Sequence, residues 1–145
     1  MIQIGCYEVT DESNPHERKA DSIIDLIECG MLEYKEKLLP QSDVILQKAW
    51  TLIQENISCN LDVAISVFVV PWDILSMYGN ELKDGFVYKL DDYRIVISKD
   101  TEFKSVFIHE LCHVLMDIVM PESRKWKTIE LEKKVTDLEN YFDIG

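Results

Sequence analysis

Residues 103–119 restrict the possible folds more than any other segment, because apolar side chains recur there at helical spacing on nearly every side. Either Asp100 or Thr101 can accept a hydrogen bond from the first helical amides, and the helix has to stop before Pro121. A helix that is apolar nearly all round belongs in the interior of a domain. We therefore expect a central, buried helix, whose apolar residues include Val106, Phe107, Ile108, Leu111, Val114 and Leu115.

The polar residues inside this apolar helix have the spacing of a metal site, His109-Glu110-Leu111-Cys112-His113. His109 and His113 are four positions apart, so both imidazoles lie on one helix face and can bind the same Zn²⁺. Glu110 then lies where its carboxylate can take the proton of a water at the open coordination position. The alternative is a pair of core histidines that only form hydrogen bonds. Because buried charges need partners, we favour zinc, with Glu110 as the general base.

A third protein ligand is expected downstream, since a catalytic zinc usually takes three and leaves one position for water. The metzincin spacing is absent, because no histidine follows His113. The candidates are Glu130, Glu132 and Glu139 in the last predicted helix. Glu132 and Glu139 flank the apolar stripe of that helix most closely. We favour Glu132, near the beginning of the helix, and leave Glu130 and Glu139 open.

The rest of the chain predicts an α+β fold. Its small sheet has three strands or slightly more and packs with N-terminal helices, the buried motif helix and a C-terminal helix. We expect a single domain, residues 1–145, with a zinc-site core at about 63–142. The predicted elements are a strand at 2–9, helices at 20–38 (with an interruption at Gly30) and 42–57, a strand at 63–70, a loop or short helix at 72–78, a hairpin of 86–90 and 93–98, and a last helix from Ser123 or Trp126 to Phe142.

Charge and composition exclude several classes of protein. The net charge of −12 argues against nucleic acid as a partner, because binding to phosphates depends on clustered Lys and Arg. No apolar run approaches the roughly 20 residues of a membrane span. The N-terminus lacks the features of a signal peptide, so we expect a cytoplasmic protein. The four cysteines show no Cys-x-x-Cys spacing and are expected to be reduced thiols.

The chain resembles the minimal gluzincin metallopeptidases, in particular the ImmA/IrrE-like group of bacteria and their mobile elements. The resemblance covers about 63–142 and comprises an Ile-rich strand, the segment Ser-Val-Phe-Ile-His-Glu-Leu-Cys-His-Val-Leu, and the helix Glu-Leu-Glu-Lys-Lys-Val-Thr-Asp-Leu-Glu-Asn. It implies His109 and His113 as ligands, Glu110 as base, and Glu132 or Glu130 as the downstream ligand. It also implies an edge strand that aligns the substrate backbone, supplied here by the hairpin around 93–98. Cys112 stands where the family usually has glycine, and its thiol is assigned no role.

The predicted function is therefore hydrolysis of a peptide bond, with a protein or peptide as substrate and a regulatory protein suggested by the resemblance. Tyr88, Tyr93 and Tyr141 are candidates for stabilising the developing oxyanion. Substrate specificity is expected to depend on loops, especially 72–85. The first alternative is a catalytically inactive, zinc-containing protein-interaction domain, and the second is a helical adaptor without metal.

Overall fold

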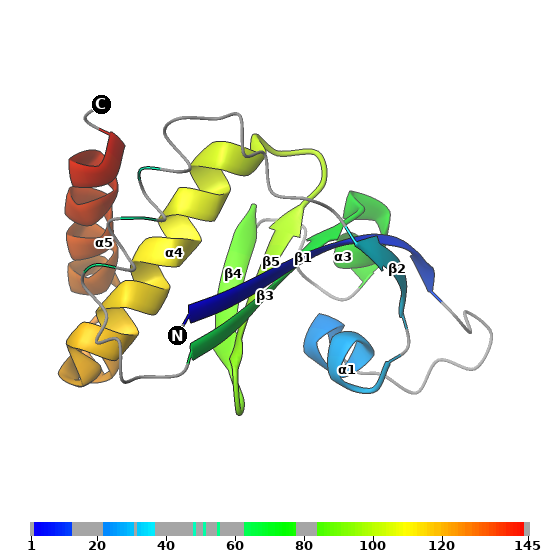
Figure 1. Ribbon diagram of the computed structural model, residues 1–145, viewed down its shortest axis with the longest axis horizontal. Helices are drawn as coiled ribbons and strands as arrows, with labels where there is room; N and C mark the ends of the chain where they lie inside the picture. The colour runs from blue at the N-terminus through cyan, green and yellow to red at the C-terminus, as the bar shows by residue number, and fades with distance from the viewer. Residues whose placement is uncertain are drawn as a thin grey trace.

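The computed structural model describes residues 2–12, 22–30, 32–36, 63–77 and 84–143, together with Lys48, Thr51 and Glu55. These residues form one mixed sheet with helices on both of its sides, as Figure 1 shows. The α+β class is as expected. The sheet is larger than the three strands of the main expectation, because it has five.

The sheet has the strand order β2-β1-β3-β5-β4. The strands are β1 (Ile2–Glu12), β2 (Leu32–Glu36), β3 (Val63–Val70), β4 (Gly85–Lys89) and β5 (Tyr93–Ser98). The three inner strands, β1, β3 and β5, run parallel, and β2 and β4 are antiparallel edge strands. β3 is apolar almost throughout because a central parallel strand is covered on both faces.

The predicted helix at 20–38 is wrong over its second half. Only α1 (Ile23–Glu28) is helical, with Asp25 N donating to Ser22 Oγ at 3.2 Å as the N-terminal cap. Gly30 has a φ of +67°, a conformation that commonly ends a helix. The chain then enters β2, in which Leu32 is buried and the following four residues are exposed. The spacing of apolar residues was compatible with a helix, but pairing with β1 makes this segment a strand.

Three other predicted elements have different outcomes. The predicted helix at 42–57 lies outside the described residues except for Lys48, Thr51 and Glu55, which are helical. The segment 72–78 contains the short helix α3 (Trp72–Met77). The hairpin is confirmed, because β4 and β5 pair antiparallel around Asp91 and Asp92.

The two faces of the sheet have separate apolar cores. Alternate residues of β3 point to opposite faces, so Val63, Ile65, Val67 and Val69 belong to one core and Phe68 and Val70 to the other. The first core lies under α4 (Phe103–Val119) and α5 (Thr128–Asp143), and the second includes residues of α1 and α3. In Figure 1, α4 and α5 lie together at one end of the view and α1 and α3 at the other.

The central buried helix is confirmed as α4, with the predicted bounds. Its N-cap is Glu102, which makes no side-chain capping bond, while Thr101 Oγ1 donates to Ser98 O at 2.8 Å, so the predicted cap is wrong. A short 3₁₀ helix, η1 (Pro121–Lys125), connects α4 to α5. None of the helices in the described ranges has both the length and the apolar character to cross a membrane.

Candidate metal centre

Three of the predicted site residues converge between α4 and α5. His109, His113 and Glu132 each offer one ligand atom, and these atoms all lie within 4.8 Å of one another. The Nε2 atom of His109 is 3.2 Å from Glu132 Oε2, and that of His113 is 3.1 Å from Glu132 Oε1. Tetrahedral ligand atoms about 2.0 to 2.2 Å from a zinc ion lie roughly 3.3 to 3.6 Å apart. The three residues therefore form a group that could hold a metal ion.

Helix periodicity on both sides explains this convergence. One turn separates His109 from His113 on α4, and their rings lie 5.0 Å apart at an interplanar angle of 74°. On α5, Val135 is completely buried against α4 and the sheet, which determines the face that the helix presents. Glu132 precedes Val135 by nearly one turn and Glu139 follows it by about one turn. Packing of the apolar stripe thus turns both glutamates toward the histidines.

Glu139, which competed for the ligand role, contacts the other nitrogen of the first histidine. Its Oε2 atom is 2.9 Å from Nδ1 of His109. A carboxylate that accepts a hydrogen bond from Nδ1 keeps the proton there and leaves Nε2 free to bind a metal. Glu130 is exposed and is not part of the cluster. The structure thus brings Glu132 to the Nε2 atoms of both histidines and Glu139 to Nδ1 of His109.

The two histidines have opposite pKa shifts. Burial by itself lowers the pKa of His109, but the hydrogen bond to Glu139 and the nearby carboxylates outweigh burial and raise it above its usual value. Burial also dominates at His113 and, with the charge of His109, lowers its pKa although Glu132 acts in the opposite direction. The two shifts favour protonation of His109 over protonation of His113 in the metal-free protein. Protons and a metal ion compete for the same imidazole nitrogens.

Glu110 lies beside the cluster, under the first residue of β4. The residue is only 5% exposed. A Cβ atom at Gly85 would lie 3.6 Å from Glu110 Oε1, but only 2.7 Å from Val106 Cγ1, so Gly85 permits a close approach that a side chain would prevent. A cavity of about 360 Å³ opens here, and its lining includes Gly85, His109, Glu110 and Glu139. The predicted general base therefore adjoins open space next to His109.

A second cavity, of about 420 Å³, lies on the other side of the histidine pair and includes His113 in its lining. Val87 and Lys89 line it from β4, and Leu131 lines it from α5. The first cavity is at the Gly85 end of β4 and the second at the Lys89 end. The two cavities thus lie along β4, one on each side of the candidate metal site.

The backbone of β4 has an open edge along this path. Ser98 N donates to Asp84 O at 2.8 Å, and the register pairs Gly85 with Ile97. Because hydrogen-bonded and non-hydrogen-bonded pairs alternate, Phe86 and Tyr88 direct their amide groups to β5, while residues 85, 87 and 89 direct theirs outward. Among the described residues no strand pairs with that edge. The resemblance implied an edge strand supplied by the hairpin around 93–98; in that hairpin β4 is the edge strand and β5 is an inner strand.

The other candidates lie in different environments. Tyr88 also lines the cavity next to His113, but its ring packs on the opposite face of the sheet and its hydroxyl donates to Glu28 Oε1 at 2.7 Å, so the hydroxyl is directed away from the histidines. Tyr93 donates to Asp117 and lines the cavity next to His113. The side chain of Tyr141 lies outside the described part of the chain. Cys112 is fully buried in the core, and burial raises its pKa to about 12, which is typical of a packed thiol.

Comparison of the chain with protein-family models, with curated protein sequences and with solved structures gave no match. The resemblance to gluzincins therefore depends on the motif residues themselves. What the structure adds is the proximity of His109, His113 and Glu132, since Glu132 is nineteen positions beyond His113 in the sequence.

We predict that Glu139→Gln weakens zinc binding while the fold is retained. The variant removes the charge that holds the Nδ1 proton of His109, and loss of such a partner typically costs about 10- to 100-fold in metal affinity. Competition with a chromophoric chelator measures the affinity. Asp137→Asn, an exposed change on the same helix, is the matched control. Equal zinc affinity in both variants would make Glu139 a surface carboxylate with no part in the site.

Proposed function

We propose that this protein is a zinc-dependent metallopeptidase of the gluzincin type. The observation that carries the proposal is the cluster of His109, His113 and Glu132, with ligand atoms within 4.8 Å of one another. Two histidines and one carboxylate are a ligand set of catalytic zinc sites that keep an open position, whereas structural zinc sites are closed by four protein ligands. The site thus supports catalysis better than a purely structural role.

The bound zinc would supply Lewis-acid chemistry, polarising the scissile carbonyl and lowering the pKa of a water. Glu110 is the group that accepts the proton of the attacking water and later delivers it to the leaving amine. Its position beside Gly85, in the cavity that also includes His109, supports this role. Glu139 orients the imidazole of His109 through Nδ1.

The open edge of β4 favours a peptide over other substrates of zinc hydrolases. Gly85, Val87 and Lys89 direct their backbone N–H and C=O groups away from β5, where an extended peptide can pair with them. A peptide on this edge runs from the cavity next to His109 to the cavity next to His113. Its backbone then crosses the candidate metal site, as hydrolysis of a peptide bond requires.

Tyr93 is the remaining described candidate for stabilising the oxyanion, since it lines the same cavity as His113. Its hydroxyl donates to Asp117, so it would have to exchange that bond for one to the substrate. Burial and the contact with Asp117 raise the pKa of Tyr93, which keeps the hydroxyl protonated and able to donate. A regulatory protein as the substrate is supported by the resemblance alone.

Metal removal tests the proposed function directly. The zinc-loaded protein is expected to cleave a mixture of denatured proteins, with new peptide termini identified by mass spectrometry. Chelation should abolish cleavage, and added zinc should restore it, because the site loses its Lewis acid without metal. If the loaded protein has four protein ligands by X-ray absorption and cleaves nothing, the zinc-containing interaction domain becomes the better reading.

A further inference from the structure

The two ends of the open edge of β4 differ in charge. At the Gly85 end, the cavity next to His109 is lined by Asp84, Glu110 and Glu139, and its described lining includes no Lys or Arg. At the other end is the cavity next to His113, here called the Lys89 cavity. Its described lining includes Lys89, Arg124 and one carboxylate, Asp117. A chain with a net charge of −12 thus has a locally positive cavity beside its candidate metal site.

The charge of Asp117 is already neutralised inside the Lys89 cavity. Arg124 binds it in a bidentate manner, with Nη2 donating to Oδ2 at 2.8 Å and Nε donating to Oδ1. Tyr93 donates a further hydrogen bond to Oδ2. The hydrogen bond from Arg124 is the main reason why the pKa of Asp117 is below its usual value. Arg124 and Asp117 compensate each other, and Lys89, which also acts electrostatically on Asp117, is the excess cation of the described lining.

Lys89 lies at the edge of this cavity, and its ammonium group contacts an aromatic ring instead of a carboxylate. Its Nζ lies 5.2 Å from the centre of the Tyr93 ring, and the ion pairs of the described residues do not include it. The walls below it are apolar, formed by Val87, Leu131 and the ring of Tyr93. A ligand that fills the cavity therefore needs an apolar stem and a negatively charged end.

We propose that the Lys89 cavity binds an acidic side chain, glutamate in the first place, of the peptide that pairs with β4. This inference rests on the proposed function, because it places the peptide on that edge. Side chains alternate along a strand, so a peptide residue opposite Val87 or Lys89 directs its side chain to the same face as theirs, into the cavity. The same acidic residue opposite Gly85 would face Asp84, Glu110 and Glu139. The acid preference is therefore restricted to one side of the metal site.

The test measures peptide binding, so that it does not depend on turnover. Fluorescein-labelled, end-blocked nonapeptides of Thr and Val with a single central Glu, Gln or Lys are titrated into zinc-loaded Glu110→Gln protein, and anisotropy gives each Kd. The net charge of −12 alone predicts the order Lys, Gln, Glu from tightest to weakest. The Lys89 cavity predicts the opposite order. We expect the Glu peptide to bind about fivefold more tightly than the Gln peptide, as for one partly exposed ion pair.

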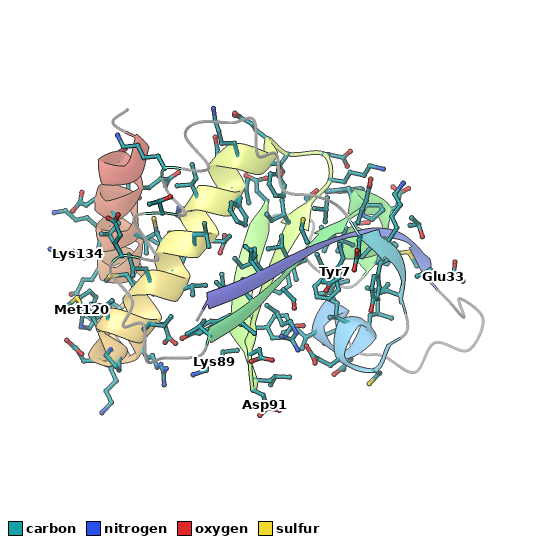
Figure 2. All side chains as sticks on the ribbon, in the orientation of Figure 1. Tyr7, Glu33, Lys89, Asp91, Met120 and Lys134 are labelled. Atoms are coloured by element: carbon teal, nitrogen blue, oxygen red, sulfur yellow. The ribbon has the colours of Figure 1, made fainter. Side chains whose placement is uncertain are left out.

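Two charge-matched variants assign the preference to a residue. Lys89→Glu in the same background should reverse the order in favour of the Lys peptide, because it turns the cavity negative. Lys134→Glu changes the net charge equally but lies on α5 away from both cavities, and Figure 2 shows Lys134 on the side of that helix opposite the sheet. The Lys134→Glu variant should therefore still bind the Glu peptide more tightly than the Lys peptide. The inference is overturned if the unmodified background prefers Lys, if both variants behave alike, or if no peptide binds.

The outcomes also separate this inference from the proposed function. Cleavage of the protein mixture by the zinc-loaded wild type without a Glu preference leaves the peptidase standing and refutes the acid-binding cavity. A Glu preference that depends on Lys89, in a protein that cleaves nothing, refutes the peptidase and leaves the cavity as the recognition site of an interaction domain.

Discussion

Glu132→Ala and His113→Ala are both expected to lose zinc. Each removes a ligand from the cluster in which the carboxylate oxygens of Glu132 lie 3.2 and 3.1 Å from the two imidazole nitrogens. Loss of a supporting group outside the ligand set costs about 10- to 100-fold in affinity, so loss of a ligand should cost more than about 100-fold. Elemental analysis of purified protein should find a single zinc ion per chain in the wild type and almost none in either variant.

Glu130→Ala is the matched control for this prediction. Glu130 lies two positions before Glu132 on the same helix, but it is exposed and does not belong to the cluster. Glu130→Ala removes the same negative charge as Glu132→Ala. It should leave the zinc content unchanged. If Glu132→Ala retains zinc and Glu139→Ala loses it, Glu139 is the metal ligand and Glu132 the supporting residue. A wild-type protein without zinc would remove the basis of the proposed function.

Glu110→Gln is expected to retain zinc and to lose hydrolysis. The amide has nearly the shape of the carboxylate, so it should fit the same buried position next to Gly85, where only 5% of the residue is exposed. It cannot accept the proton of the attacking water, and loss of a general base typically slows a reaction about 10²- to 10⁴-fold. The rate of cleavage of a defined peptide and the zinc content should be measured on the same preparation.

The comparison of these two quantities decides what Glu110 does. Loss of both hydrolysis and zinc would indicate that Glu110 holds the site together rather than moving a proton. Undiminished hydrolysis by Glu110→Gln would rule out Glu110 as the base. Glu130→Gln, the same chemical change on an exposed residue, should alter neither quantity.

The sequence alone was sufficient for elements that depend on local periodicity. The bounds of α4 and the identity of β3 and of the β4–β5 hairpin agree with the predictions, because each has a strong and uninterrupted pattern of apolar residues. The proximity of His109 and His113 is equally local, since four positions make one helical turn. These features require no knowledge of the rest of the chain.

The errors lie where two patterns fit the same residues. The segment after Gly30 was predicted as helix, and it is β2 because β1 offers it a pairing partner twenty or more positions away. β2 is thus the one strand of the five-stranded sheet that the sequence did not predict. β1 pairs in parallel with β3 across a long stretch of chain, and nothing local to either strand encodes that pairing.

Within the site, only the tertiary structure distinguished residues of the same chemical type. Glu130, Glu132 and Glu139 lie on one helix, and the burial of Val135 decides which of them face the histidines. The order of the strands likewise makes β4 the open edge and β5 an inner strand. The sequence by itself determined the chemistry of the motif and the helix that carries it, because both depend on neighbouring residues. The partners of that helix depend on packing between distant segments, which only the folded chain brings together.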